Sequence, residues 1–124
     1  MSLVECSNVS VKISEKGGAG AFANKDFQKN ELIEKGIVRI VPVDGNNSPY
    51  VFTWSEDRTV WAIGSGCSTF YNSSSNDPNT YMVRHYQENR FEIFANRDIQ
   101  QGEELLHTYK SLNWRTCFVP IIDK

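Results

Sequence analysis

Short apolar runs with a period of two dominate this chain. Val9, Val11 and Ile13 alternate with polar residues, as side chains do in a strand with one buried face. Further apolar segments between turn-forming residues are IVRIV (37–41), YVFTW (50–54) and TVWAI (59–63). No segment keeps a 3.6-residue apolar period over three turns. The pattern predicts a mostly β protein, with at most one or two helical turns, around residues 55–59 or 111–117.

One pair of segments has the marks of a hairpin. TYMVRHY (80–86) and RFEIF (90–94) are rich in β-branched and aromatic residues, and Gln87-Glu88-Asn89 joins them. We therefore expect an antiparallel pair here. The polar stretch DGNNSP (44–49), which follows Pro42, closes the IVRIV strand and indicates a surface loop rather than a domain boundary.

A ten-residue stretch occurs twice. FANKDFQKNE (22–31) returns as FANRDIQQGE (94–103), 72 residues later, with six of the ten positions identical. Two copies are too few for a solenoid, so we interpret them as one strand-turn-strand corner used twice. Asn30 in the first copy corresponds to Gly102 in the second, and both residue types tolerate positive φ. A tight turn is expected there, with new strands starting at Glu31-Leu32-Ile33 and Glu104-Leu105-Leu106.

Composition narrows the class of protein. A chain of 124 residues with 40% hydrophobic and 12% aromatic content fits a single compact domain over residues 1–124. The formal charge of -2 offers no basic field for direct nucleic-acid binding. The N-terminus lacks a basic region followed by a long apolar stretch, and no run is long enough to span a membrane. We expect a soluble intracellular protein, cytoplasmic or nuclear.

The spacing of the three cysteines does not indicate a disulfide framework. Cys6, Cys67 and Cys117 are widely spaced, odd in number and without a CxxC pair. Neither a set of structural disulfides nor a zinc site is indicated, and a reducing compartment is the better expectation. His85 and His107 form no metal pair with a nearby cysteine or carboxylate cluster, so no metal is expected.

Three motifs resemble those of one family. GGAGAF (17–22), FYNSSSNDPNT (70–80) and GEELLHTY (102–109) occur in the order of the GxG turn, the Asn-His-Ser…Pro-Asn segment and the Gly-Glu-Glu-Leu strand of SET-domain methyltransferases. The resemblance runs from about Val9 to Trp114 and is closest to the compact, single-domain, viral-type SET proteins. It implies a β-clip-like fold of small curved sheets with a C-terminal pseudoknot, without the zinc-binding pre-SET or post-SET segments.

The resemblance also implies an activity and a cofactor. SET proteins transfer a methyl group from S-adenosyl-L-methionine to a lysine side chain of a protein, with histone tails as the best-known substrate. By this likeness Gly18, Ala19 and Gly20 border the cofactor. Residues without bulky side chains let the backbone approach a ligand, although such a turn alone more often marks only a tight bend. Loop composition alone would likewise explain the Ser- and Asn-rich segment.

The second motif departs from the family pattern. Asn72 would hydrogen-bond the adenosine part of the cofactor, and the backbone of Ser73 would read the adenine edge. Ser73 stands where the family has histidine, and one residue is inserted before Pro78-Asn79. A backbone contact survives this change, but a packed, hydrogen-bonding ring is lost. Trp114 is expected to stack on the adenine or along the lysine channel.

Tyr109 is the residue expected to act in catalysis. Methyl transfer to an amine is an in-line displacement, so the enzyme must hold a neutral lysine nitrogen on the axis of the S–CH3 bond and exclude water. A phenol suits this position because it donates or accepts a hydrogen bond without a permanent charge. Tyr50, Tyr71 and His107 are candidates for the substrate channel, with a place in the core as the alternative for the tyrosines.

Two functions from different classes therefore remain open. One is a protein-lysine methyltransferase, and the other is a SET-like binding module that keeps the fold without the chemistry. The missing motif histidine, the inserted residue and His107 in place of the usual aromatic favour the second. A homodimer in which the partner completes the substrate groove is a further hypothesis, since the compact viral proteins resemble this chain.

Overall fold

A computed structural model of the chain describes residues 2–42, 51–55, 59–74 and 76–107. The strands that form within these ranges are β1 (Val9–Ile13), β2 (Ala19–Ala23), β3 (Leu32–Val41), β4 (Phe52–Thr53), β5 (Trp61–Gly64), β6 (Asn72–Ser73), β7 (Thr80–His85), β8 (Arg90–Ala95) and β9 (Glu104–His107). Two 3-10 turns accompany them, η2 (Ser68–Phe70) and η3 (Tyr86–Glu88). The predicted mostly β character is confirmed.

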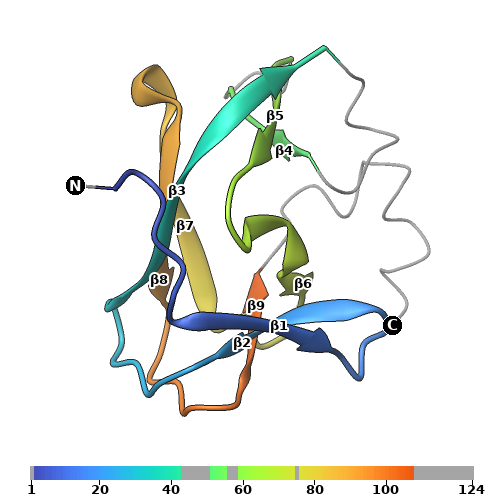
Figure 1. Cartoon of the computed structure of the whole chain (residues 1–124), viewed down its shortest axis with the longest axis vertical. Helices are drawn as coiled ribbons and strands as arrows, with labels where there is room; N and C mark the ends of the chain where they lie inside the picture. The colour runs from blue at the N-terminus through green and yellow to red at the C-terminus, as the bar shows by residue number, and fades with distance from the viewer. Residues whose placement is uncertain (1, 43–50, 56–58, 75, 108–124) are drawn as a thin grey trace.

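The strands form two sheets (Figure 1). The smaller has the order β1-β2-β9-β6, and the larger has the order β4-β5-β3-β8-β7. Neighbouring strands are antiparallel except β6 and β9, which run parallel. The central strand β3 pairs with β5 and β8 rather than with its sequence neighbours β2 and β4. Residues from distant parts of the chain are thereby brought to one place.

The predicted hairpin is the β7–β8 pair. Tyr81 pairs with Phe94, and their rings stack with centroids 5.5 Å apart. The short η3 turn and Asn89, which adopts a left-handed conformation with φ of 51°, reverse the chain. The YVFTW segment forms less strand than expected, because β4 covers only Phe52–Thr53 within the part of the chain described. Of the predicted helical turns, residues 56–58 and 111–117 lie outside the described residues.

The core lies between the two sheets. Alternation along β8 buries Phe91, Ile93 and Ala95, and β9 adds Leu105 from the smaller sheet. Phe27 and Ile99, the apolar anchors of the two corners, are 2% and 1% exposed. The duplicated stretch thus contributes core as well as turns.

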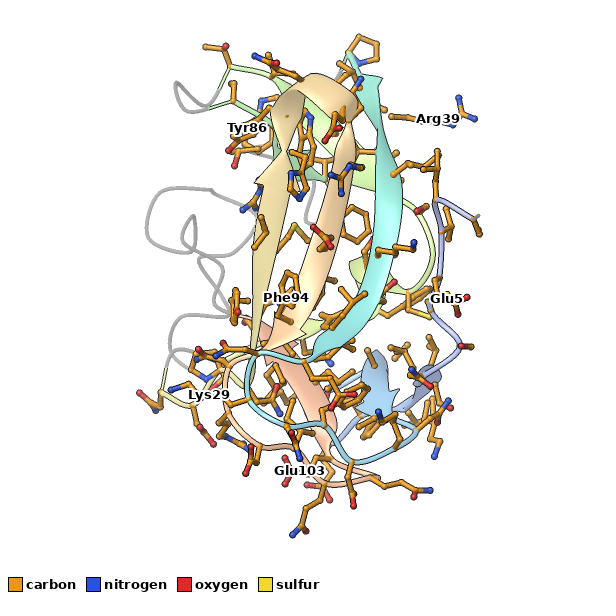
Figure 2. All side chains as sticks on the ribbon, turned by 90° about the vertical axis from the view of Figure 1, so that its left-hand side faces the viewer. Glu5, Lys29, Arg39, Tyr86, Phe94 and Glu103 are labelled. Atoms are coloured by element: carbon orange, nitrogen blue, oxygen red, sulfur yellow. The ribbon has the colours of Figure 1, made fainter. Side chains whose placement is uncertain are left out.

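The two copies of the corner bind each other. The backbone of Phe27 and that of Ile99 exchange both hydrogen bonds, at 2.8 and 2.9 Å. Asn30 and Gly102 have φ of 70° and 93°, so the positive φ predicted for both turns is confirmed. Each copy delivers the chain into a strand, β3 or β9, and the corners meet at one end of the larger sheet (Figure 2).

Asp26 and Asp98, the aspartates of the two copies, also make reciprocal hydrogen bonds. Asp98 Oδ1 accepts from the amide of Lys29 at 2.9 Å, and Asp26 Oδ1 accepts from the amide of Gln101 at 2.8 Å. Each copy therefore supplies a carboxylate to the turn of the other. This mutual pairing accounts for the identity of the two sequences at the aspartate position.

Candidate functional site

The GxG segment begins in the turn between β1 and β2 with Gly18 and continues into β2 with Ala19 and Gly20. Ser14 donates its amide to Gly18 O at 2.9 Å, and Gly17 donates to Ser14 O at 3.1 Å. Gly17 and Gly18 have φ of 102° and 66°, which residues with a Cβ rarely adopt. A Cβ built on either would meet no atom of the described residues within 4 Å, so those residues leave the backbone of this turn uncovered.

Gly20 serves a different purpose from Gly18. A Cβ at Gly20 would lie 2.4 Å from Glu104 Oε2 and 3.1 Å from Asn72 Nδ2. The same Cβ would lie 2.9 Å from Ser14 Cβ, and a contact under 3.0 Å requires something to shift, so Gly20 leaves room for Ser14 and Glu104. The second glycine of the motif is required by packing against the other two motifs.

The Glu104 carboxylate joins the three motifs. Ser14 Oγ donates to its oxygens at 2.8 and 2.9 Å, and Asn72 Nδ2 donates to Oε2 at 2.8 Å. Asn72 Nδ2 also donates to the Ala19 carbonyl at 3.2 Å. The structure thus brings together Ala19, Gly20 and Asn72, which the sequence named as cofactor residues. Ser14 and Glu104 were missed, although Glu104 is part of the GEEL motif.

The loop that follows Asn72 is hydrogen-bonded to β9 at both of its ends. Ser73 pairs in parallel with His107, and Ser74 donates its amide to His107 O at 2.8 Å. At the other end of the loop, the Asn79 side chain donates to Glu104 O at 2.8 Å and accepts from the Leu106 amide at 2.7 Å. Asn79 is 1% exposed, so its amide replaces backbone pairing inside the fold. This role explains the asparagine of the Pro-Asn motif.

A buried polar group lies behind β9. The ring of His107 stacks on Tyr71 with centroids 4.5 Å apart and an interplanar angle of 9°. Tyr71 donates its hydroxyl to Glu34 Oε1 at 2.6 Å, and His107 Nδ1 lies 2.6 Å from Thr80 Oγ1. Thr80 Oγ1 also lies 2.9 Å from Leu106 O, so its single hydroxyl hydrogen is shared between two neighbours, Leu106 O and His107 Nδ1.

Burial controls the ionisation of this group. It raises the pKa of Glu34 to about 7, although the hydrogen bonds from Tyr71 and the Cys67 amide act in the opposite direction. Burial, followed by the charge of Arg84, lowers the pKa of His107 to about 3. His107 is therefore a neutral ring at neutral pH. Tyr71 is 1% exposed and His107 5% exposed, and their assignment to a lysine channel stays a prediction.

Three predicted site residues lie outside the described residues. They are Tyr109, expected in catalysis, Trp114, expected at the cofactor, and Tyr50, expected in the channel. Among the residues that are described, no three His, Cys, Asp or Glu side chains gather in a way that could hold a metal ion. Within the same ranges, no helix is long and apolar enough to cross a membrane.

Comparison with known proteins agrees with this geometry. The family model of the SET domain matches residues 18–110. Histone-lysine N-methyltransferase trr of Drosophila melanogaster is 32% identical over 117 residues, which cover 84% of this chain. The chain spans only 5% of the length of that relative.

Solved structures share the fold. A chain of the Chaetomium thermophilum Polycomb Repressive Complex 2 superposes with a TM-score of 0.69 and 25% identity, over 93% of this chain and 17% of that one. A Plasmodium falciparum protein assigned provisionally as a histone methyltransferase superposes with a TM-score of 0.67 and 23% identity, over 82% of this chain and 96% of that one. These likenesses confirm the predicted fold class.

Proposed function

Because the chain belongs to the SET domain family, we propose that it is an S-adenosyl-L-methionine-dependent protein-lysine N-methyltransferase. The observation that carries the proposal is the meeting of the three motifs at the Glu104 carboxylate, where Gly20 leaves room for Asn72. The name of the Drosophila relative makes histones the first substrate to try. Histones are nuclear proteins, so a histone substrate would place this protein in the nucleus.

The described residues fit the cofactor. The open space at Gly17 and Gly18 leaves the backbone of the turn available to a ligand. Both hydrogen bonds of Asn72 use Nδ2, so Oδ1 is the atom with which a hydroxyl or amino donor of adenosine would pair. The backbone of Ser73 and the ring of Trp114 complete the proposed cofactor set. The cofactor supplies a methyl group on a sulfonium centre.

The chain's own residues then have two tasks. Tyr109 hydrogen-bonds the lysine nitrogen and holds it in line for displacement, and Tyr50, Tyr71 and His107 border the channel that excludes water. Lysine has an ordinary pKa of about 10.4, so a dry channel must favour the neutral amine. A His107 ring that stays neutral adds no charge to such a channel.

The first experiment is transfer of a labelled methyl group to histones and to a whole-cell protein extract. The parent chain is compared with Tyr109→Phe and with Tyr86→Phe, a matched control on an exposed tyrosine of η3. We expect label with the parent and the control and none with Tyr109→Phe. Methylation by Tyr109→Phe at the parent rate would remove the proposed role of Tyr109.

A binding module without chemistry is the second candidate. Ser73 replaces the motif histidine, a residue is inserted before Pro78, and His107 stacks in the core where the family has Phe or Tyr. Direct calorimetric titration with S-adenosyl-L-methionine separates the two functions. Absence of binding together with absence of label on any protein would favour the module, whereas binding with label would exclude it.

Two features of organisation belong to the same proposal. Residues 1–124 form one domain, and two copies associate so that the partner completes the substrate groove. Size-exclusion chromatography with light scattering tests the association. A monomer at high protein concentration would contradict the homodimer and leave the proposed chemistry unaffected.

A further inference from the structure

Three segments that are distant in sequence meet around Glu34: β3 itself, the segment around η2 and the N-terminal segment. Tyr71 donates its hydroxyl to Glu34 Oε1 at 2.6 Å, and Cys67 donates its amide to Oε2 at 3.3 Å. These two residues flank η2, so a single buried carboxyl group holds both ends of that turn. The turn leads directly into Asn72 of the candidate cofactor site.

The N-terminal segment reaches the same place. Glu5 and Lys35 exchange backbone hydrogen bonds at 2.9 and 3.0 Å, which fixes the segment beside β3, as Figure 2 shows for Glu5. A Cβ built on Gly66 would lie 3.3 Å from Cys6 Sγ and 3.0 Å from Glu34 Oε2. Cys6 therefore lies against the residue that precedes Cys67.

The two thiols are neighbours that a small reagent can reach. Cys6 Sγ packs against Gly66, the residue before Cys67, and the Cys6 thiol is among the groups that raise the pKa of Cys67. Both cysteines are free and half-buried. Two neighbouring cysteines are candidates for oxidation to a disulfide, because a sulfenic acid formed on one can react with the thiol of the other.

We propose that Cys6 and Cys67 form a reversible intramolecular disulfide when the protein meets a peroxide. The Cys6 thiolate attacks one oxygen, the O–O bond breaks, and hydroxide leaves, giving a sulfenic acid on Cys6. The Cys67 thiolate then attacks the Cys6 sulfur, the S–O bond breaks, and a second hydroxide leaves. With the two thiol protons these become two water molecules. Each sulfur loses one electron, and the peroxide gains two.

The surroundings assign the order of the two sulfurs. Burial, followed by the charges of Glu34 and Cys6, raises the pKa of Cys67 to about 12, so its thiolate is scarce at neutral pH. Cys6 is therefore the sulfur that reacts with the peroxide.

The bond would have a measurable effect on the fold. It would tie the N-terminal segment to the loop that carries η2, and it would close a loop of roughly 60 residues in the unfolded chain. Because loss of unfolded-state freedom stabilises the native state, we expect the thermal midpoint to rise by roughly 5 to 15 °C.

The test uses hydrogen peroxide on the full chain, followed by tryptic digestion without reduction. The three cysteines fall on separate peptides, 1–12, 59–84 and 116–124, so mass spectrometry distinguishes every pairing. We expect the 1–12 and 59–84 peptides joined, the link reversed by dithiothreitol, and the thermal midpoint raised. Cys6→Ser and Cys67→Ser should lose both effects, and Cys117→Ser, the matched control, should keep them.

Three results would overturn the proposal. The first is a disulfide from Cys6 or Cys67 to Cys117 that forms as often in the folded chain as in the chain unfolded by urea. Pairing in urea is unselective, so equal frequencies would mean that the fold does not favour the Cys6–Cys67 bond. The second is over-oxidation of Cys6 without any linked peptide. The third is a linked protein whose thermal midpoint does not move. None of these readouts depends on methyl transfer, so the proposal stands apart from the proposed activity.

Discussion

At the scale of single residues, the two glycines of the GxG motif have different physical reasons. Gly18 is required by its φ of 66°, with nothing near the position of a side chain. Gly20 is required by space, because a Cβ would lie 2.4 Å from Glu104 Oε2. A motif that reads as one unit in the sequence thus combines a conformational requirement with a packing requirement.

Substituting each glycine by alanine separates these requirements. Gly20→Ala must push Glu104 away from Asn72, and such overpacking costs about 1–3 kcal/mol in the free energy of unfolding. Gly18→Ala meets no atom and costs only its left-handed conformation, about 1 kcal/mol. Urea denaturation measures both free energies. We expect Gly20→Ala to weaken binding of S-adenosyl-L-methionine through Asn72, and Gly18→Ala to weaken it because the added Cβ enters the space proposed for the cofactor; binding by Gly20→Ala as tight as that of the parent would contradict this account.

At the scale of elements, the duplicated corners act as one interlocked pair. Each aspartate accepts a backbone hydrogen bond from the other copy, Asp98 from Lys29 and Asp26 from Gln101. Removing one carboxylate leaves the turn of the opposite copy without its acceptor. The stability of each corner therefore depends on the sequence of the other.

Alanine substitutions test this dependence. Asp26→Ala and Asp98→Ala should each lower the free energy of unfolding by about 1 kcal/mol, the usual contribution of one such hydrogen bond. Asp26→Asn and Asp98→Asn, which keep an oxygen acceptor, should lose less. Urea denaturation of the four variants gives the comparison. An asparagine variant as unstable as its alanine counterpart would mean that charge, rather than the hydrogen bond, stabilises the turn.

Local signals explain which elements could be predicted from the sequence. Alternation revealed β1 as a strand, although of its apolar residues only Val9 is buried while Val11 and Ile13 are exposed. β-Branched and aromatic residues around a short polar connection revealed the β7–β8 hairpin, and the exchange of Asn30 for Gly102 revealed the positive φ of the two turns. The pairing of Phe27 with Ile99 could not be predicted, because it depends on the register of strands far apart in the chain. Glu104 was missed for a similar reason: a glutamate on a short strand gives no sign that Ser14 and Asn72 surround it.

At the scale of the whole molecule, two buried groups make stability depend on pH in opposite directions. Glu34 has a pKa of about 7 in the folded chain against an ordinary 4.5. Its contribution is fully present below pH 4.5 and is lost as the pH rises to 7. His107 has a pKa of about 3 against an ordinary 6.5. Its contribution is fully present above pH 6.5 and is lost as the pH falls to 3.

The two dependences overlap between pH 4.5 and 6.5, where they oppose each other. We therefore expect the free energy of unfolding to be highest within this range, to fall above it as Glu34 ionises, and to fall below it as His107 is protonated. Each group alone changes stability by a few kcal/mol, since one unit of pKa corresponds to about 1.4 kcal/mol. The net fall above pH 6.5 is smaller, less than about 1 kcal/mol, because it spans only the interval from pH 6.5 to the Glu34 pKa of about 7. Urea denaturation at a series of pH values measures the curve.

Two variants show which residue causes the fall in stability on each side of the maximum, called here the acid limb (low pH) and the alkaline limb (high pH). Glu34→Gln keeps a group that can accept the Tyr71 hydroxyl but cannot ionise, so the fall above pH 6.5 should disappear while the acid limb stays. His107→Gln should remove the acid limb and leave the alkaline limb. Glu92→Gln, on the outer face of β8, is the control and should retain both. If Glu34→Gln kept the alkaline fall, the carboxyl group held between Tyr71 and Cys67 would not be the group that titrates there.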